Sequence, residues 1–182
     1  MVVRDAVLAD VPQIAAIWNP IVRDTAITFW PTERSHDQIT TLITERQGTG
    51  HAFLVAEVRG VIAGFGTYTQ FRAGGGYARS QEHTIYLAPG HRGLGLGRLL
   101  LTRIEDHARA GGHRILIGGI TGSNEPSIAF HAAMGYARWG QIPMAGWKLE
   151  QFHDLVLMGK DLWAEGDDRS DNAPLSSGRL SG

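Results

Sequence analysis

The sequence predicts a single-domain α/β protein built around a mixed sheet. Two observations carry this prediction. The chain has 182 residues, which is enough to bury one sizeable core and favours one domain over two. Its apolar residues recur at helical spacing in some segments and follow strand patterns in others. Along the chain these segments predict helices, then an antiparallel set, then the order β-α-β-α-β-β.

The N-terminal part predicts a short strand and two helices. Val2 to Arg4 forms the strand, and Asp10 begins a helix in which Gln13, three residues later, completes a capping box. Ser35 and Gln38 repeat the same capping signature before a second helix. Both helices carry an apolar stripe, so each is expected to pack one face on the core.

The middle of the chain predicts an antiparallel hairpin. Strands at Phe53–Val58 and Val61–Tyr68 flank an Arg-Gly turn at residues 59 and 60. The glycine-rich segment Arg72–Gln81 is expected to be a flexible loop.

The second half alternates strands and helices. A strand at Glu82–Ala88 ends at Pro89-Gly90, and a helix at Gly97–Ala110 is stopped by two glycines. The remaining expected elements are a strand at Arg114–Ile120, a helix at Glu125–Met134 that begins near Asn124, and strands at Tyr136–Gln141 and Phe152–Lys160. Residues 1–163 are therefore expected to form the domain. Residues 164–182 are rich in Asp, Ser and Gly and are expected to form a disordered tail.

Composition excludes several functional classes. The net charge is -1 and the basic residues are scattered, so neither a nucleic-acid groove nor binding to an acidic membrane is expected. The chain has no cysteine, which excludes disulfides, thiolate metal sites and a cysteine nucleophile. The histidines lack metal-site spacing, so no metal is expected. No apolar run approaches the roughly 18 residues of a membrane span. Asp5 and Asp10 argue against a signal peptide, so the cytoplasm is the expected location.

The strongest local signal is a glycine loop between a strand and a helix, Arg92-Gly93-Leu94-Gly95-Leu96-Gly97. Backbone N–H groups in such a loop can approach an anion, and the helix N-terminus adds the positive end of its dipole. The pattern therefore favours a pyrophosphate cradle, although a turn that only permits tight packing would look similar. A dinucleotide fingerprint would need glycine at Arg98, and the Gly-Lys-Ser/Thr of a P-loop is absent.

This loop resembles the coenzyme A motif of the GNAT superfamily of N-acetyltransferases, Arg/Gln-x-x-Gly-x-Gly/Ala. The resemblance implies a mixed, mostly antiparallel sheet flanked by helices, and acetyl-CoA as co-substrate. It implies that the loop amides bind the pyrophosphate while the preceding strand and a later asparagine bind the pantetheine arm. The implied cofactor-binding residues are Ile85, Tyr86, Leu87, Arg92, Gly93, Leu94, Gly95, Leu96, Gly97, Arg98 and Asn124.

A narrower resemblance is to the phosphinothricin and methionine sulfoximine/sulfone acetyltransferases, and it covers about residues 2–162. The motifs that carry it are Glu82-His83-Thr84-Ile85-Tyr86-Leu87, Asn124-Glu125-Pro126-Ser127-Ile128, Phe130-His131, Met134-Gly135-Tyr136, Trp147-Lys148 and Phe152-His153-Asp154. The resemblance implies acetyl transfer to the α-amino group of a small amino-acid analogue, and a homodimer. The loop at residues 73–78 departs from the subgroup because it is rich in glycine.

Glu82 and His131 are the candidate catalytic residues. Glu82 begins the strand that leads into the glycine loop, where its carboxylate can take a proton from the acceptor amine, directly or through a water. A surface carboxylate at a strand start is the ordinary alternative. In the subgroup, the position of His131 is occupied by histidine, where many superfamily members have a tyrosine that protonates the leaving thiolate. His131 is therefore expected to act as general acid or to assist Glu82; otherwise it is a half-buried helix histidine.

The resemblance implies substrate-binding residues in three segments. Arg72 follows a strand and is expected to clamp the substrate carboxylate with its guanidinium fork, although a solvated loop arginine is nearly as plausible. The implied substrate residues are Arg72, Ala73, Gly74, Glu82, His83, Thr84 and Phe29. Trp30, Phe71 and Tyr77 are further candidates for the pocket wall.

Three functional hypotheses follow from the sequence. The first is N-acetylation of amino-acid analogues by direct attack in a ternary complex, because the missing cysteine disfavours an acyl-enzyme. The second keeps the co-substrate but changes the acceptor to a polyamine, an antibiotic or a protein N-terminus. The third is a coenzyme A-binding module without activity, which the presence of both Glu82 and His131 disfavours.

Overall fold

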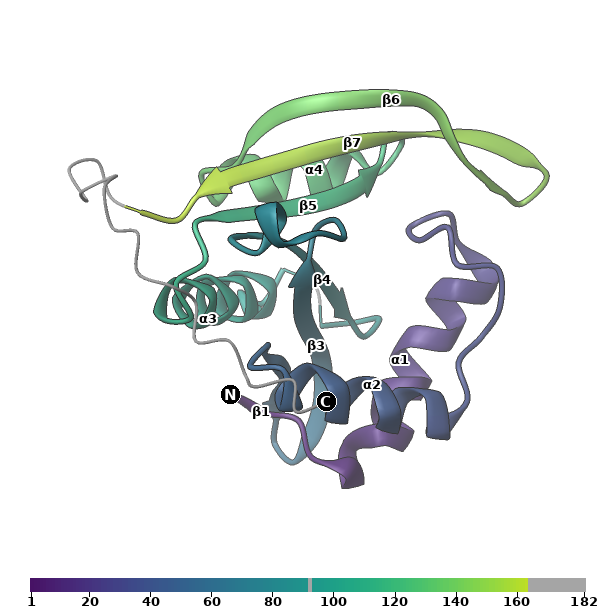
Figure 1. The fold of residues 1–182 in the computed structure, drawn as a ribbon. Helices are drawn as coiled ribbons and strands as arrows, with labels where there is room; N and C mark the ends of the chain where they lie inside the picture. The colour runs from purple at the N-terminus through teal and green to yellow at the C-terminus, as the bar shows by residue number, and fades with distance from the viewer. Residues whose placement is uncertain (92, 164–182) are drawn as a thin grey trace, which may run out of the picture.

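The computed structural model describes residues 1–91 and 93–163, so Arg92 and the expected tail at 164–182 lie outside the described residues. One sheet dominates the described part (Figure 1). Its strands are β1 (Val2–Asp5), β2 (Phe53–Val58), β3 (Val61–Gln70), β4 (Ser80–Leu87), β5 (Ile115–Thr121), β6 (Ala137–Lys148) and β7 (Gln151–Asp161). The α-helices are α1 (Val11–Asp24), α2 (His36–Gly48), α3 (Leu96–Ala110) and α4 (Glu125–Ala133). Within the described ranges, no helix is both long enough and apolar enough to cross a membrane.

The strands lie in the order β1-β2-β3-β4-β5-β7-β6, and β4 with β5 is the parallel pair among otherwise antiparallel neighbours. This confirms the mixed, mostly antiparallel sheet. The hairpin of β2 and β3 turns at Arg59 and Gly60 as expected, and both residues have positive φ. Ser35 also caps α2 as expected, and its side chain accepts from the backbone N–H of Gln38.

Side chains of β2 and β3 alternate between two cores because successive residues of a strand face opposite sides of the sheet. Phe53 and Phe65 pack with α1 and α2, whereas Leu54 and Ala63 pack with α3. Figure 1 shows α3 on one side of β3 and β4, and α1 with α2 on the other. This layering leaves the far ends of β4 and β5 free to border a site.

The parallel strands β4 and β5 separate partway along their length. Their pairing runs only from Ser80 with Ile115 to His83 with Gly118. β4 continues to Leu87 and β5 to Thr121, but beyond this point the two strands no longer pair with each other. The backbone of residues 84–87 therefore lacks a strand partner on its β5 side, and space opens between the two strands.

The capping box expected at Asp10 and Gln13 is wrong. Asp10 precedes α1 but makes no capping bond with it; its carboxylate instead accepts from the Arg4 guanidinium at 2.7 and 2.9 Å and from the Val7 N–H at 2.9 Å. The Gln13 side chain accepts from the N–H of Ile62. Asp10 is thus engaged by residues that precede it, and Gln13 by a residue 49 positions later in the chain. These contacts take up the groups that the local pattern assigned to the helix start.

The final hairpin is longer than the sequence predicts. β6 was expected to end at Gln141 but continues to Lys148, past an irregularity at residues 142–146 where Met144 has positive φ. The hairpin turns at Leu149 and Glu150, both with positive φ, and neither residue is a usual turn former. The absence of glycine or asparagine at this turn explains why the pattern did not reveal it.

Candidate active site

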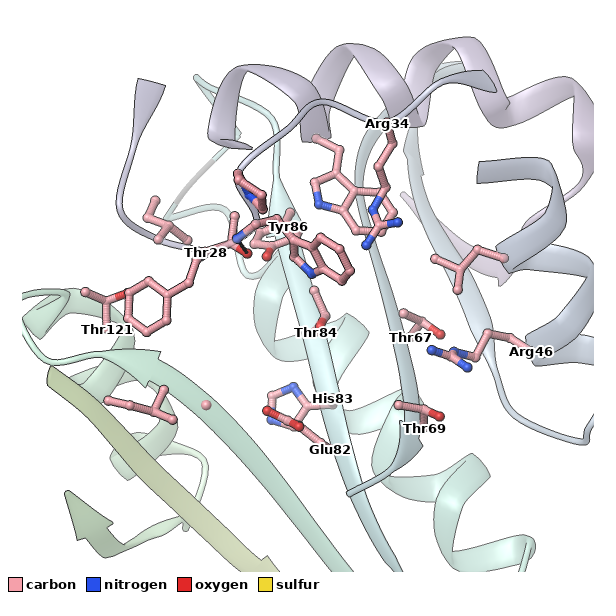
Figure 2. Close-up of a pocket in the computed structure, with 18 residues that line it drawn as sticks. Thr28, Arg34, Arg46, Thr67, Thr69, Glu82, His83, Thr84, Tyr86 and Thr121 are labelled. Carbon is pink, nitrogen blue, oxygen red and sulfur yellow. Dashed lines mark hydrogen bonds between the residues drawn. The ribbon is translucent and has the colours of Figure 1, made fainter. Parts of the chain in front are cut away.

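A cavity of about 580 Å³, here called the Glu82 cavity, lies where the N-terminal helices face β3, β4 and β5 (Figure 2). Its walls are formed by Trp18, Ile27, Thr28, Phe29, Trp30, Pro31, Arg34, Leu42, Arg46, Thr67, Thr69, Glu82, His83, Thr84, Tyr86, Gly119, Thr121 and Leu155. Several of these are hydroxyl side chains from three strands. The cavity therefore offers many polar contacts to a small, polar ligand.

A second cavity of about 340 Å³, the glycine-loop cavity, lies between the far end of β4 and α4. Its lining includes Ile85, Leu87, Gly93, Gly97 and Phe130. A small cavity of about 70 Å³ shares lining residues with both larger ones, and is bounded by the separated parts of β4 and β5. The two larger cavities thus meet where the parallel strands diverge.

Glu82 lies on the wall of the Glu82 cavity, on β4 between Thr69 of β3 and Ile117 of β5. Its side chain is half-buried. Burial raises the pKa of the Glu82 carboxyl, and the positive charge of Arg72 partly offsets this effect. A carboxyl with a raised pKa, facing a cavity, is suited to accept a proton near neutral pH.

Two glycines of β5 make room for the polar side chains of β4 and α4. A Cβ at Gly119 would lie 2.8 Å from Oε1 of Glu82. A Cβ at Gly118 would lie 3.0 Å from Nε2 of His83 and 3.1 Å from Nε2 of His131. Glu82 thus occupies one face of β5, and the two histidines occupy the other. In the sequence these two glycines are visible only as part of a buried strand, so no local signal points to this role.

His131 is stacked on His83, with 5.1 Å between ring centroids, and both are buried. Burial lowers the pKa of His83 to about 3, and burial also lowers the pKa of His131, so both rings are neutral at pH 7. The Nδ1 of His131 lies 2.7 Å from the carbonyl oxygen of Ser127, so we assign the proton to Nδ1. The Nε2 of His131 then carries no proton. This arrangement favours the assisting role of His131 over the general-acid role.

The glycine loop forms a sharp turn into α3. Gly93 and Gly95 have φ values of 76° and 79°, and a Cβ on either would meet nothing within 4 Å. Leu96, buried to 1% exposure, anchors the first residue of α3, while Leu94 and Arg98 are exposed. Asn124, which borders the same cavity, caps α4 by accepting from the N–H of Ser127. The loop thus leaves open space beside the first-turn amides of α3, as an anion site requires.

The expected substrate residues divide into two groups. Glu82, His83, Thr84 and Phe29 line the Glu82 cavity, and so does Trp30. The structure places another group outside that lining, namely Arg72, Ala73, Gly74, Phe71 and Tyr77. The Arg72 guanidinium lies 5.1 Å from the ring centroid of Phe71, and its loop is held by Gln70, whose amide donates to the carbonyl oxygens of Arg72 and Gly74. The positive charge of Arg72 lowers the pKa of the Glu82 carboxyl.

The roof of the cavity is held by contacts that have no local signal in the sequence. Residues 25–31 connect α1 to the rest of the chain, and the later strands fix them. Lys148 of β6 donates to the carbonyl oxygens of Thr28 at 2.9 Å and Trp30 at 2.7 Å. The hydroxyl of Thr121 donates to the carbonyl oxygen of Ala26. Such contacts join residues about a hundred positions apart, so local patterns give no sign of them.

Replacing Gly119 with Ala is expected to lower turnover about tenfold or more, because the new Cβ displaces the Glu82 carboxylate and an ångström-scale misplacement is costly in catalysis. The melting temperature should change little, since a flexible side-chain end can move aside. Gly140→Ala is the control, because a Cβ there meets nothing within 4 Å. Equal turnover by the two variants in a thiol-release assay would contradict the importance of this contact.

Parallel strands that diverge, a glycine turn into α3 and a cavity-facing carboxylate just before the point of divergence fit an acetyltransferase of the α/β class. The chain belongs to the acetyltransferase (GNAT) family, whose model matches residues 16–136. The chain is similar to the L-methionine sulfoximine/L-methionine sulfone acetyltransferase of Salmonella typhimurium, with 34% identity over 87% of this chain and 92% of the relative. It is 31% identical to the phosphinothricin N-acetyltransferase of Streptomyces viridochromogenes, over 87% of this chain and 86% of that one.

Solved structures show the same relationship. An acetyltransferase from Salmonella typhimurium, solved with its cofactor acetyl-CoA, superimposes with a TM-score of 0.87 at 32% identity. The match covers 93% of this chain and 98% of that one. The family and the subgroup to which the sequence was likened are thereby confirmed.

Proposed function

We propose that this chain transfers the acetyl group of acetyl-CoA to the α-amino group of a small amino-acid-like acceptor. The observation that carries the proposal is the position of Glu82, in the wall of a cavity that meets the glycine-loop cavity where β4 and β5 diverge. The relatives named for methionine sulfoximine, methionine sulfone and phosphinothricin support this acceptor class.

Acetyl-CoA would occupy the glycine-loop cavity. The amides at residues 93–98 would bind its diphosphate, because the glycines leave open space there and α3 contributes its positive end. The backbone of Ile85, Tyr86 and Leu87, which lacks a β5 partner, would hydrogen-bond the pantetheine arm, with Asn124 on the opposite wall. Arg92, also expected to contact the diphosphate, lies outside the described residues. A cytoplasmic location fits this co-substrate.

Glu82 would act as the general base. The acceptor amine must lose a proton before its lone pair can attack the thioester carbonyl, and the Glu82 carboxylate would accept that proton. The new C–N bond forms as the C–S bond breaks, and coenzyme A leaves as the thiolate. The nitrogen loses its second proton as the amide forms, and the thiolate takes up a proton, so the exchange balances. His131, neutral and without a proton on Nε2, would assist by accepting a hydrogen bond rather than by donating that proton.

A thiol-release assay with acetyl-CoA tests the proposed function. The acceptors are phosphinothricin, methionine sulfoximine and methionine sulfone, with spermidine and a short peptide as the alternative amines. We expect turnover with at least one amino-acid analogue and less with spermidine, because Arg34 and Arg46 make the cavity unfavourable for a polycation. Absence of activity above background on all three analogues would remove this acceptor class.

We also propose that the chain forms a homodimer through β6. This strand is at the edge of the sheet, and the hairpin that it forms with β7 exposes a group of large apolar side chains. They are Trp139, Ile142, Met144, Trp147, Leu149 and Phe152. A second copy could cover this surface symmetrically. Light scattering after size exclusion should give twice the mass of the 19.8 kDa chain, and a monomer at micromolar concentration would contradict the proposal.

A further inference from the structure

Two arginines on the helical wall of the Glu82 cavity have no acidic partner in the described part of the chain. Arg34 precedes α2 and Arg46 lies near its end, and both line the cavity (Figure 2). Neither forms an ion pair within 4 Å with a described residue. The nearby carboxylate of Glu33 is already paired with Arg23 at 2.8 Å. The cavity wall thus carries two positive charges without a matching negative charge.

Arg34 is fixed in place by its surroundings. Its guanidinium carbon lies 4.6 Å from the ring centroid of Trp18 and 4.3 Å from that of Trp30. The side chain of Asn19 donates to the backbone carbonyl oxygen of Arg34 at 3.0 Å and accepts from its backbone N–H at 2.9 Å. Ordering a long arginine side chain costs conformational entropy, so a guanidinium held in this way is prepared for a ligand.

Three N–H groups on this wall are buried without an acceptor among the described residues, namely Nε of Arg34, Nε of Arg46 and Nε1 of Trp18. All three are donors, and a buried donor without a partner is costly. Burial lowers the pKa of both guanidiniums. The negative charge of Glu45 partly offsets this for Arg46, and the positive charge of Arg34 lowers the pKa of Arg46 again. An anion between the two arginines would relieve both the repulsion and the missing hydrogen bonds.

Glu82 lies across the cavity from this wall, on the sheet side. If the reacting amine lies at Glu82, a group at the other end of the acceptor faces the two arginines. We infer that Arg34 and Arg46 form a subsite for an acidic group at the side-chain end of the acceptor. The chain therefore prefers α-amino acids with a second anionic group, such as a phosphinate or carboxylate, over neutral ones. This inference rests on the proposed acetyl transfer and specifies its acceptor.

Phosphinothricin and methionine sulfoximine form a matched pair of probes, because their side-chain heads are similar in size and tetrahedral but only phosphinothricin carries a negative charge there. We expect the wild type to have the higher kcat/KM with phosphinothricin. Arg34→Gln and Arg46→Gln should each lower the ratio of the two kcat/KM values at least tenfold, about the effect of losing one charged hydrogen bond. The change should appear mainly in KM for phosphinothricin.

Two controls separate binding from folding. Arg103→Gln, at an exposed position of α3, should leave the ratio unchanged. Arg46 does not stack on the tryptophans, so Arg46→Gln remains informative if Arg34→Gln proves unstable. A wild type that prefers methionine sulfoximine, or variants that lose both activities in equal proportion, would overturn the inference.

A binding measurement distinguishes failure of the inference from failure of the proposed function. Calorimetry with phosphinothricin should show binding to the wild type that is at least tenfold weaker in Arg46→Gln. If this result is found without any acetyl transfer, the anion subsite stands and the proposed function fails. If acetyl transfer occurs but affinity for phosphinothricin is the same in wild type and variant, the subsite fails and the proposed function stands.

Discussion

Replacing Glu82 with Gln is expected to lower kcat by about 100-fold or more, since general base catalysis contributes roughly 10² to 10⁴. Glutamine keeps the shape of the side chain but cannot accept the proton of the acceptor amine. The KM for acetyl-CoA should stay close to the wild-type value, because Glu82 is not among the residues that line the glycine-loop cavity. Steady-state kinetics with acetyl-CoA and phosphinothricin measure both quantities.

The pH profile gives a second readout of the same group. Burial raises the pKa of Glu82, and the base works only when deprotonated, so kcat of the wild type should fall as pH drops through that raised pKa. Glu82→Gln should lack this acidic limb. Arg72→Gln should move the limb to higher pH, because the charge of Arg72 holds the pKa of Glu82 down. If Glu82→Gln turned over as fast as the wild type, or if it kept the acidic limb of the wild-type profile, Glu82 would not be the base.

The sequence revealed those parts of the site that are formed by consecutive residues. The glycine loop, the strand before it and the cap of α4 each carry a local signal, and all of them border the glycine-loop cavity. The hairpin of β2 and β3 was predictable for the same reason, since its turn is encoded by Arg59 and Gly60. In these elements, the local preference and the final structure agree.

The acceptor side of the site was less predictable because it is assembled from distant segments. Arg34 and Arg46 face Glu82 only after α1 and α2 have packed on the sheet, and no local pattern distinguishes them from other surface arginines. Lys148 holds the cavity roof through hydrogen bonds to residues 120 and 118 positions earlier in the chain. Arg72, expected to clamp the substrate, instead lies outside the lining of the Glu82 cavity, so its role as a clamp remains a prediction.

Replacing Gly95 with Val is expected to raise the KM for acetyl-CoA about 10- to 100-fold. Gly95 precedes α3 with a φ of 79° and ψ of -2°, a left-handed conformation that a β-branched residue rarely adopts. Forcing valine into it costs about 1–3 kcal/mol, and each 1.4 kcal/mol corresponds to a factor of ten in affinity. The loop would relax to another conformation, and the amides of residues 93–98 would no longer converge on one anion.

The folded protein should tolerate this change better than the co-substrate does. A Cβ at Gly95 meets no atom within 4 Å, and the buried Leu96 still anchors α3 in the core. The melting temperature without ligand should therefore fall by only a few degrees, as expected for a loss of about 1 kcal/mol. Gly50→Val is the matched control, because Gly50 has a similar φ of 77° and a Cβ there also meets no atom within 4 Å, but Gly50 lies outside the glycine loop. If Gly95→Val bound acetyl-CoA as tightly as the wild type, the left-handed turn would not be what aligns the amides, and the cradle would have to lie elsewhere.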